Sequence, residues 1–262
     1  MNSKRQNRSH RIARVLCPFL PTAERPVCLD ESEASHLHQV LRLRNGDPVI
    51  ALDGKGAEIS AQIQYRDKSL WLETVMQKPS RSLPLEAETT PLVLEVAILK
   101  GDAMSWVIEK AVELGARRLV PLECDYGVVE IAKKGTEHFV ERWQRIADQA
   151  LKQCERLHRM KVDSPRSVLE ALKERAPHRW VAIEPSAAFS EARPIEFSDQ
   201  ELHVMIGPEG GWSPTECDAF RAELKQGHLK MASLGPLVLR AETASLFVLS
   251  SALQAKINGV PS

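Results

Sequence analysis

Near its C-terminal end, the chain carries a glycine loop whose residue types could bind a small ligand. The loop reads Gly-Pro-Glu-Gly-Gly over residues 207–211, and it follows three apolar residues, 204–206, that are typical of a buried strand. Gly210 and Gly211 permit positive φ angles and let a ligand approach the backbone closely. The pattern predicts either a ligand-binding loop or a plain tight turn.

A helix is expected to begin directly after this loop. Ser213, Pro214 and Glu216 match the N-cap, N1 and N3 positions of a capping box. A strand, a glycine loop and a helix in this order often hold a small ligand at the carboxyl edge of a parallel sheet. The loop lacks the lysine of a Walker motif and the Gly-x-Gly-x-x-Gly spacing of a dinucleotide site, so its ligand is expected to be of another kind.

The composition limits the class of protein. The chain has 262 residues, enough for two modest domains, with 43% hydrophobic and 27% charged residues. No apolar run approaches the ~20 residues of a membrane helix, and residues 15–21 are too short and proline-rich for a signal core. The five cysteines contain no Cys-x-x-Cys, so neither a zinc site nor a disulfide framework is expected. We expect a cytoplasmic protein without metal or membrane contact.

The net charge is zero, but the charges are unevenly distributed. The first fourteen residues contain five cations and no acid: Lys4, Arg5, Arg8, Arg11 and Arg14. Such an arm often contacts nucleic acid phosphates, although a solvated terminus explains it equally well.

The first third of the chain predicts a small β-barrel with one helix. Residues 29–43 form an amphipathic pattern with Asp30 or Ser32 as the N-cap, and residues 47–65 and 69–77 alternate with a period of two. The proline-rich segment 79–91 has no periodicity and marks a domain boundary. We therefore expect one domain over residues 1–80 and a second over 81–262.

The second domain predicts an α/β fold with a mainly parallel sheet, because strand and helix patterns alternate. The expected strands begin at residues 92, 118, 180, 203 and 229, and the expected helices cover 102–116, 137–157 and 241–257. Gly115 is the expected stop of the first helix.

A basic stripe is expected on the helix at 137–157. Helical spacing places Arg145, Lys152, Arg156 and Arg159 near one another, with Arg142 beside them. The stripe predicts contact with phosphates, and an ordinary solvated face is the alternative.

Two loops together carry a family resemblance. Ile-Gly-Pro-Glu-Gly-Gly at 206–211 and Leu-Arg-Ala-Glu-Thr-Ala at 239–244, supported by residues 99–122 and 147–156, closely resemble the RsmE family of the SPOUT methyltransferase superfamily. That family methylates N3 of a uridine in bacterial 16S rRNA. Arg11, Arg14 and residues 36–47 look like its PUA-like RNA-binding barrel.

The resemblance implies a SPOUT-type parallel sheet with a C-terminal deep trefoil knot that binds S-adenosyl-L-methionine, in a homodimer acting on 16S rRNA of the small ribosomal subunit. The knot is one of the rare exceptions to unknotted topology. The cofactor-binding residues that it implies are Ile183, Glu184, Ile206, Gly207, Gly210, Gly211, Leu234, Gly235, Leu239, Thr243 and Ala244.

Three residues are candidates for the chemistry that the resemblance implies. As the N3 proton leaves, negative charge spreads over the uracil oxygens, and Arg240 could stabilise that charge. A guanidinium stays protonated at neutral pH, so the base would be Glu209 or Glu242. The alternatives are a non-catalytic RNA-binding assembly factor, an RNA methyltransferase with another target base and, less compatible with the loop spacing, a nucleotide-dependent oxidoreductase.

The chain departs from the family pattern in four places. Tyr126, in Cys-Asp-Tyr-Gly, stands where the family has an arginine, and Leu237 stands near another usual arginine. Lys152 replaces a common glutamate, and the proline that usually follows the Gln-x-x-Arg motif is missing around Met160. These departures concern RNA contacts, while the cofactor loops match the family.

Overall fold

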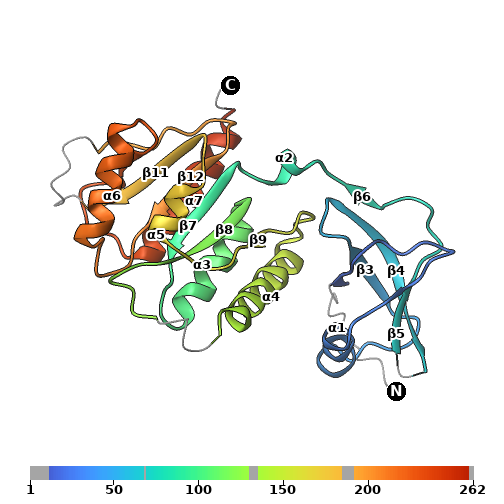
Figure 1. Ribbon diagram of the computed structural model, residues 1–262. Coiled ribbons are helices and arrows are strands. Elements are labelled where there is room, and N and C mark those ends of the chain that lie inside the picture. Colours follow the sequence, from blue (N-terminus) through green and yellow to red (C-terminus); the bar gives the residue numbers. More distant parts are fainter. Residues whose placement is uncertain (1–11, 68, 130–134, 185–191, 260–262) are drawn as a thin grey trace, which may run out of the picture. The chain divides into compact units, whose positions relative to one another are not determined.

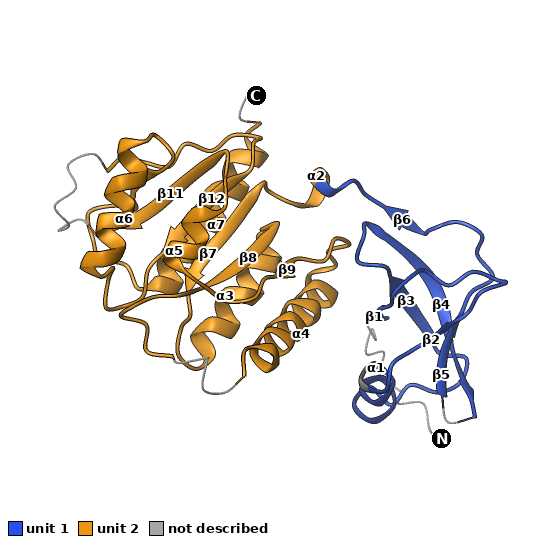
Figure 2. Ribbon diagram, viewed as in Figure 1, with its two compact units in different colours: residues 1–85 blue, residues 86–262 orange. Residues whose placement is uncertain are grey.

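The computed structural model describes residues 12–67, 69–129, 135–184 and 192–259. The described chain forms two compact units, residues 1–85 and 86–262 (Figure 2). The sequence places the boundary at residue 80. The first unit extends further because β6 (Arg81–Ser82) pairs with β4 (Ala57–Arg66).

The first unit is built on a six-stranded sheet in the order β1-β3-β4-β5-β2, with β6 beside β4 (Figure 1). The remaining strands are β1 (Ala13–Leu16), β2 (Val27–Cys28), β3 (Pro48–Leu52) and β5 (Ser69–Glu73). β1 and β3 are parallel, whereas the other pairs are antiparallel. Alternate residues of these strands are buried, which is the predicted period of two.

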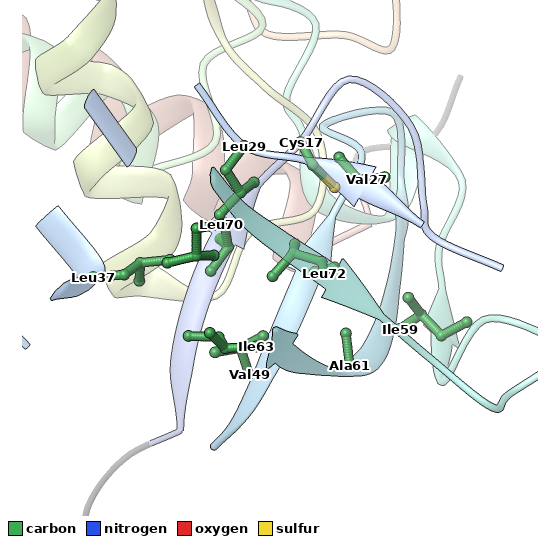
Figure 3. Close-up of a cluster of buried hydrophobic side chains, with 12 residues drawn as sticks. Cys17, Val27, Leu29, Leu37, Val49, Ile59, Ala61, Ile63, Leu70 and Leu72 are labelled. Atoms are coloured by element: carbon green, nitrogen blue, oxygen red, sulfur yellow. The ribbon is translucent and has the colours of Figure 1, made fainter. Parts of the chain in front are cut away.

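The core of this unit is apolar. Side chains such as Leu37, Ile63 and Leu72 belong to one buried cluster, which Figure 3 shows. Leu37 comes from the helical segment, which consists of α1 (Glu31–Ser35) and a π-helical turn, His36–Val40. The Asp30 carboxylate accepts a hydrogen bond from the Glu33 amide at 2.9 Å, as an N-cap does; the Ser32 side chain lies outside the described part.

The second unit confirms the predicted parallel α/β fold. Its seven described strands pair in parallel in the order β10-β8-β7-β12-β11-β13, with β9 beside β8. These strands are β7 (Leu92–Ala97), β8 (Arg118–Glu123), β9 (Lys161–Val162), β10 (Arg166–Ser167), β11 (His178–Ile183), β12 (Leu202–Ile206) and β13 (Lys230–Ser233). The central strands are buried along almost their whole length, as expected for strands covered on both faces.

Helices cover this sheet (Figure 1). They are α2 (Leu85–Glu88), α3 (Asp102–Glu113), α4 (Thr136–Cys154), α5 (Val168–Lys173), α6 (Pro214–Lys225) and α7 (Ala241–Ile257). α3 packs on both α4 and α7, and α5 packs on α6. The predicted helix at 241–257 is confirmed at both ends.

Two helix ends show how the sequence sets the boundaries. α3 stops before Gly115, as predicted: the residue has φ +80°, and a Cβ there would lie 2.9 Å from the Glu88 carbonyl oxygen. α4 was expected to reach residue 157 but ends at Cys154. Glu155 adopts a left-handed conformation with φ 63°, and the Leu157 amide then donates to the Glu88 carboxylate at 2.9 Å.

None of the helices in the described part of the chain is long and apolar enough to cross a membrane.

Candidate functional site

A cavity of about 420 Å³ opens where β11, β12 and β13 end. Its walls come from three loops at the carboxyl edge of the sheet and from the first turn of α7. Parallel strands end at the same edge, so loops that are distant in sequence meet there. The predicted site residues that line the cavity are Ile183, Glu184, Ile206, Gly207, Glu209, Gly210, Gly211, Leu234, Gly235, Leu239, Arg240 and Ala244. Glu242 and Thr243 do not line it.

The first wall is the glycine loop after β12, which Trp212 holds in shape. A Cβ on Gly207 would lie 2.8 Å from the Trp212 ring, so only glycine fits beneath the indole. The indole Nε1 donates to the Ala182 carbonyl oxygen at 3.0 Å, and the ring meets Phe220 edge-on at 5.0 Å between centroids. Trp212 therefore links the glycine loop to β11 and to α6.

The predicted capping box at the start of α6 is confirmed. The Ser213 hydroxyl accepts from the Glu216 amide at 3.2 Å, and the Glu216 carboxylate accepts from the Ser213 amide at 2.7 Å. Both residues are almost fully buried. The same pair also holds the chain after β8: Glu216 accepts from the Asp125 amide at 3.1 Å, and the Asp125 carboxylate accepts from the Ser213 hydroxyl.

The second wall is the loop after β13. Gly235 has φ +128°, a conformation that L residues rarely adopt, and no atom lies within 4 Å of a Cβ placed there. Leu237 and Val238 are largely exposed. Arg240 is the N-cap residue of α7; its side chain is exposed and makes no cap hydrogen bond.

The third wall is the end of β11. Ile183 is buried, and the Glu184 carboxylate is exposed. A Cβ on Gly211, which has φ +73°, would lie 3.8 Å from the Glu184 Oε1 atom, so the carboxylate faces the glycine loop. The chain directly after Glu184 lies outside the described residues.

The two candidate bases differ in position. Glu209 is exposed and lines the cavity. Glu242 lies in the first turn of α7, where its Oε2 atom is buried without a hydrogen-bond partner among the described residues.

The prediction that Arg156 belongs to the basic surface stripe is wrong. This residue lies beyond the end of α4 and is 5% exposed. Its guanidinium donates to the carbonyl oxygens of Val112 at 3.1 Å and Ala116 at 2.9 Å. Burial lowers the pKa of Arg156 to about 10. Arg156 therefore caps the C-terminus of α3 and is removed from the set of surface cations.

The other predicted RNA-binding residues have varied surroundings. Arg145 is exposed on α4, and Lys152 is half-buried there. Arg159 lies beyond the helix and forms a two-pronged ion pair with Asp148, each bond 2.7 Å long. Arg14 lies in β1, where its guanidinium pairs with the Glu58 carboxylate. Arg11 lies outside the described residues.

Several residues of the site were not predicted as such. Trp212, Cys217 and Val238 line the cavity, and Asp125 holds the glycine loop from a distant part of the chain. The one signal in the sequence that could have identified Trp212 as a site residue was its position directly after the two glycines. Among the described residues, no cluster of three or more His, Cys, Asp or Glu side chains could hold a metal ion.

Comparison with known proteins defines the class. Residues 86–253 match the model of the RNA methyltransferase domain, and residues 29–74 match that of the RNA methyltransferase PUA domain. The two matched segments fall in the second and first compact units, respectively. The fold is thus that of a SPOUT-type RNA methyltransferase with a PUA-like N-terminal domain.

Comparison with individual relatives identifies the family within this class. The chain is 30% identical to "Ribosomal RNA small subunit methyltransferase E" of Bacillus subtilis, covering 84% of this chain and 86% of the relative. The protein of the same name from Synechocystis is 29% identical, covering 87% and 72%. A Legionella pneumophila protein, solved with S-adenosylmethionine bound, superposes with a TM-score of 0.77 at 27% identity, covering 94% of this chain and 98% of that one. The chain belongs to the ribosomal RNA small subunit methyltransferase E family, the RsmE family.

Proposed function

We propose that this protein transfers the methyl group of S-adenosyl-L-methionine to N3 of a uridine in 16S rRNA of the small ribosomal subunit. The observation that carries the proposal is the cavity at the carboxyl edge of the sheet, which gathers nearly all of the predicted cofactor residues. The curated relatives of this chain are named as small-subunit rRNA methyltransferases, and the Legionella structure contains the cofactor. The proposal includes a cytoplasmic location, which the modification of ribosomal RNA requires.

The residues present fit the cofactor. A volume of about 420 Å³ lies in the usual range for a small-molecule site. Ile183, Ile206, Leu239 and Ala244 supply apolar surface for an adenine, and the open space at Gly235 lets the ligand approach the backbone. The Glu184 carboxylate adds an acceptor and a negative charge beside a cationic ligand. These features suit a purine that carries a positively charged side group. Such a ligand is also compatible with the knotted loop that the family resemblance implies.

The protein's own residues must position the uracil and manage its N3 proton. The bound cofactor supplies an activated methyl group. Arg240, exposed at the mouth of the cavity, stabilises the charge that develops on the uracil oxygens. Glu209 is the better-supported base, because it lines the cavity and Glu242 does not. In this proposal Glu242 is the second candidate, with Thr243 beside it in the first turn of α7.

RNA contacts are assigned to both domains. In this proposal residues 1–80 bind RNA and residues 81–262 carry out methyl transfer. Arg145, Lys152 and Arg159, with Arg142 beside them, contact phosphates of the substrate, and Arg11 and Arg14 contribute from the first domain. The charges of Arg142 and Arg145 are available for such contacts, because both side chains are exposed on α4.

A homodimer is also part of the proposal. Large apolar side chains are exposed near the cavity and on the adjacent helices: Leu237 at 72%, Val238 at 64%, Phe247 at 48% and Trp106 at 37%. Phe247 lies on α7 and Trp106 on α3, two helices that pack together. A contiguous exposed apolar patch is typical of an interface, and in this proposal these side chains form one. A partner that covers Leu237 and Val238 would also close one side of the cavity.

Nucleoside analysis of 16S rRNA tests the function. Mass spectrometry of rRNA from a strain lacking this protein is expected to show the loss of one N3-methyluridine, which the wild-type gene restores. Loss of a different methylated base would support another target base. Unchanged nucleosides, together with no binding of S-adenosylmethionine by the purified protein, would support the assembly-factor alternative.

A further inference from the structure

The turn after β8 carries an aromatic ring beside the cofactor cavity. Tyr126 is 49% exposed. A Cβ on Gly210 would lie 3.1 Å from the Tyr126 Cβ atom, so the tyrosine is a direct neighbour of the glycine loop. Gly210 lines the cavity and Tyr126 does not. Tyr126 therefore lies beside the glycine loop, next to the residues that line the cavity.

The turn that carries the ring is held firmly. The Gly127 amide donates to the Cys124 carbonyl oxygen at 2.8 Å, and a Cβ on Gly127 would lie 2.9 Å from that oxygen. Asp125 is bound to the buried capping box of α6 through both its amide and its carboxylate. A side chain on such a turn loses little further freedom when it binds a partner, which favours affinity.

The ring itself has no partner in the described part of the protein. No described residue stacks on it or hydrogen-bonds to its hydroxyl group. A single exposed aromatic side chain is common, so exposure alone indicates nothing. The exposure of Tyr126 is informative because the residue lies beside the glycine loop of the cavity and on a turn that hydrogen bonds hold.

Cations lie near the same segment. Val128, two residues after Tyr126, lines a second cavity of about 530 Å³ together with Lys100, Asp102 and Arg142. All three charged side chains are exposed. The segment after β8 thus carries an aromatic ring beside the glycine loop and borders a cavity with two cations and one carboxylate. Proteins bind single-stranded RNA with this combination of stacking surfaces and phosphate-binding cations.

We propose that Tyr126 is a substrate-positioning residue whose ring stacks on a nucleobase of the RNA strand that enters the cofactor cavity. Lys100 and Arg142 bind phosphates of the same strand. The inference rests on the proposed function, because it takes RNA as the substrate. Every base has a π-face, so stacking fixes where the strand lies and leaves the choice of base to the cavity.

The test compares Tyr126→Leu with Tyr126→Phe. Leucine keeps apolar volume and removes the π-face, whereas phenylalanine keeps the ring. The probe is 16S rRNA from a strain lacking the protein, with affinity measured by filter binding and kinetics by methyl incorporation. We expect Tyr126→Leu to raise the Kd and KM for RNA by about 5- to 100-fold and to change kcat at saturating RNA far less. Tyr126→Phe should stay within about 2-fold of wild type.

Binding of S-adenosylmethionine, measured by calorimetry, reports whether each variant is folded. Both variants should bind the cofactor as the wild type does. Should Tyr126→Leu fail to do so, Tyr126→Asn, which suits a turn, takes its place in the comparison.

The outcomes separate the inference from the proposed function. RNA binding by Tyr126→Leu equal to wild type, or an equal loss in Tyr126→Phe, overturns the stacking role while the function stands. A wild-type protein that methylates no uridine overturns the function, and the RNA affinities of the two variants still decide the stacking. A change of oligomeric state in Tyr126→Leu, seen by sedimentation, assigns the ring to a protein contact and also overturns the inference.

Discussion

The Asp125 carboxylate accepts a hydrogen bond from the hydroxyl group of Ser213, although the two residues lie 88 positions apart in the chain. The same hydroxyl accepts from the Glu216 amide, so one side chain both caps α6 and binds the turn after β8. Only Trp212 separates the glycine loop from Ser213. Its shape therefore depends on a residue outside the loop, in the turn that also carries Tyr126.

Asp125→Ala and Ser213→Ala should destabilise the protein to different extents. Asp125→Ala leaves a buried hydroxyl donor unpaired, which costs about 1–2 kcal/mol. Ser213→Ala removes the helix cap as well, so roughly twice that loss is expected. Asp218→Ala is the control, because its ion pair with Arg221 is exposed and should change stability by less than about 0.5 kcal/mol. The measurement is the urea midpoint of the intact protein, and equal midpoints for the first two variants would contradict the shared role of Ser213.

Gly235→Val should abolish tight cofactor binding. The substitution places a branched side chain in the cofactor cavity, so the Kd for S-adenosylmethionine should rise by well over ~10-fold. Gly227→Val is a matched control: Gly227 also has positive φ and open space around its Cβ position, but it follows α6 and does not line the cavity. Calorimetry that finds the same affinity for both variants would remove the loop after β13 from the cofactor site.

Gly210→Val should also weaken cofactor binding by more than ~10-fold. Its interpretation is less direct, because the new side chain would meet Tyr126 as well as the cavity.

Local patterns were sufficient to predict most of the fold. The period of two in the first unit, the capping box at Ser213 and the stop at Gly115 all depend on residues close in sequence, and the structure confirms them. The site that combines the two glycine loops was implied by the family resemblance. The fold explains it, because parallel strands end at one edge and the loops that follow them lie there.

Long-range contacts explain what the sequence could not predict. Helical spacing placed Arg156 on a surface stripe, but the chain leaves the helix at Glu155, and the guanidinium turns inward to the end of α3. Asp125 showed no local sign of its role, and Trp212 showed only its position after the two glycines, because the partners of both residues lie on other elements. Such contacts follow from the folded arrangement and not from any period in the sequence.

Arg156→Ala and Arg145→Ala should have opposite signatures. Arg156→Ala leaves two buried carbonyl oxygens without their charged donor, so stability should fall by roughly 3 kcal/mol, with the salt dependence of RNA binding unchanged. Arg145→Ala should leave stability nearly unchanged and flatten the salt dependence by roughly one counterion or less. Urea denaturation and a salt titration of RNA affinity measure the two effects. An unchanged slope for Arg145→Ala would mean that this part of α4 is merely solvated.

Stability in acid should depend on Glu174. Burial raises the pKa of this carboxyl group, but hydrogen bonds and charges from Arg118 and then Arg166 outweigh that effect and lower the pKa from 4.5 to about 2. A lowered carboxyl pKa stabilises the folded state above pH 4.5, and this contribution is lost as the pH falls towards 2. Glu174→Gln should therefore be less stable than wild type at neutral pH, and the difference should shrink between about pH 4.5 and 2. A difference that stays constant down to pH 2, in urea titrations at several pH values, would show that the ion pairs do not cause it.

Arg240 should contribute to methyl transfer and not to cofactor binding. The residue is the N-cap of α7, yet its side chain makes no cap hydrogen bond and is exposed at the cavity mouth. A positive charge at the positive end of a helix dipole does not stabilise the helix, so its position points to an anionic partner. Arg240→Ala should leave the affinity for S-adenosylmethionine within a few-fold of wild type and reduce turnover by ~10²–10³, the usual loss for one charge-stabilising donor.

Two variants sharpen this test. Arg240→Lys should restore little activity if the contact uses two guanidinium N–H groups. Arg221→Ala, which removes an exposed arginine of α6 outside the cavity, should leave turnover unchanged. The deciding measurement is single-turnover methylation at saturating RNA and cofactor. A near-normal rate for Arg240→Ala would exclude its guanidinium from the chemical step and leave Glu209 and the backbone amides of the glycine loop as the groups that act on the uracil.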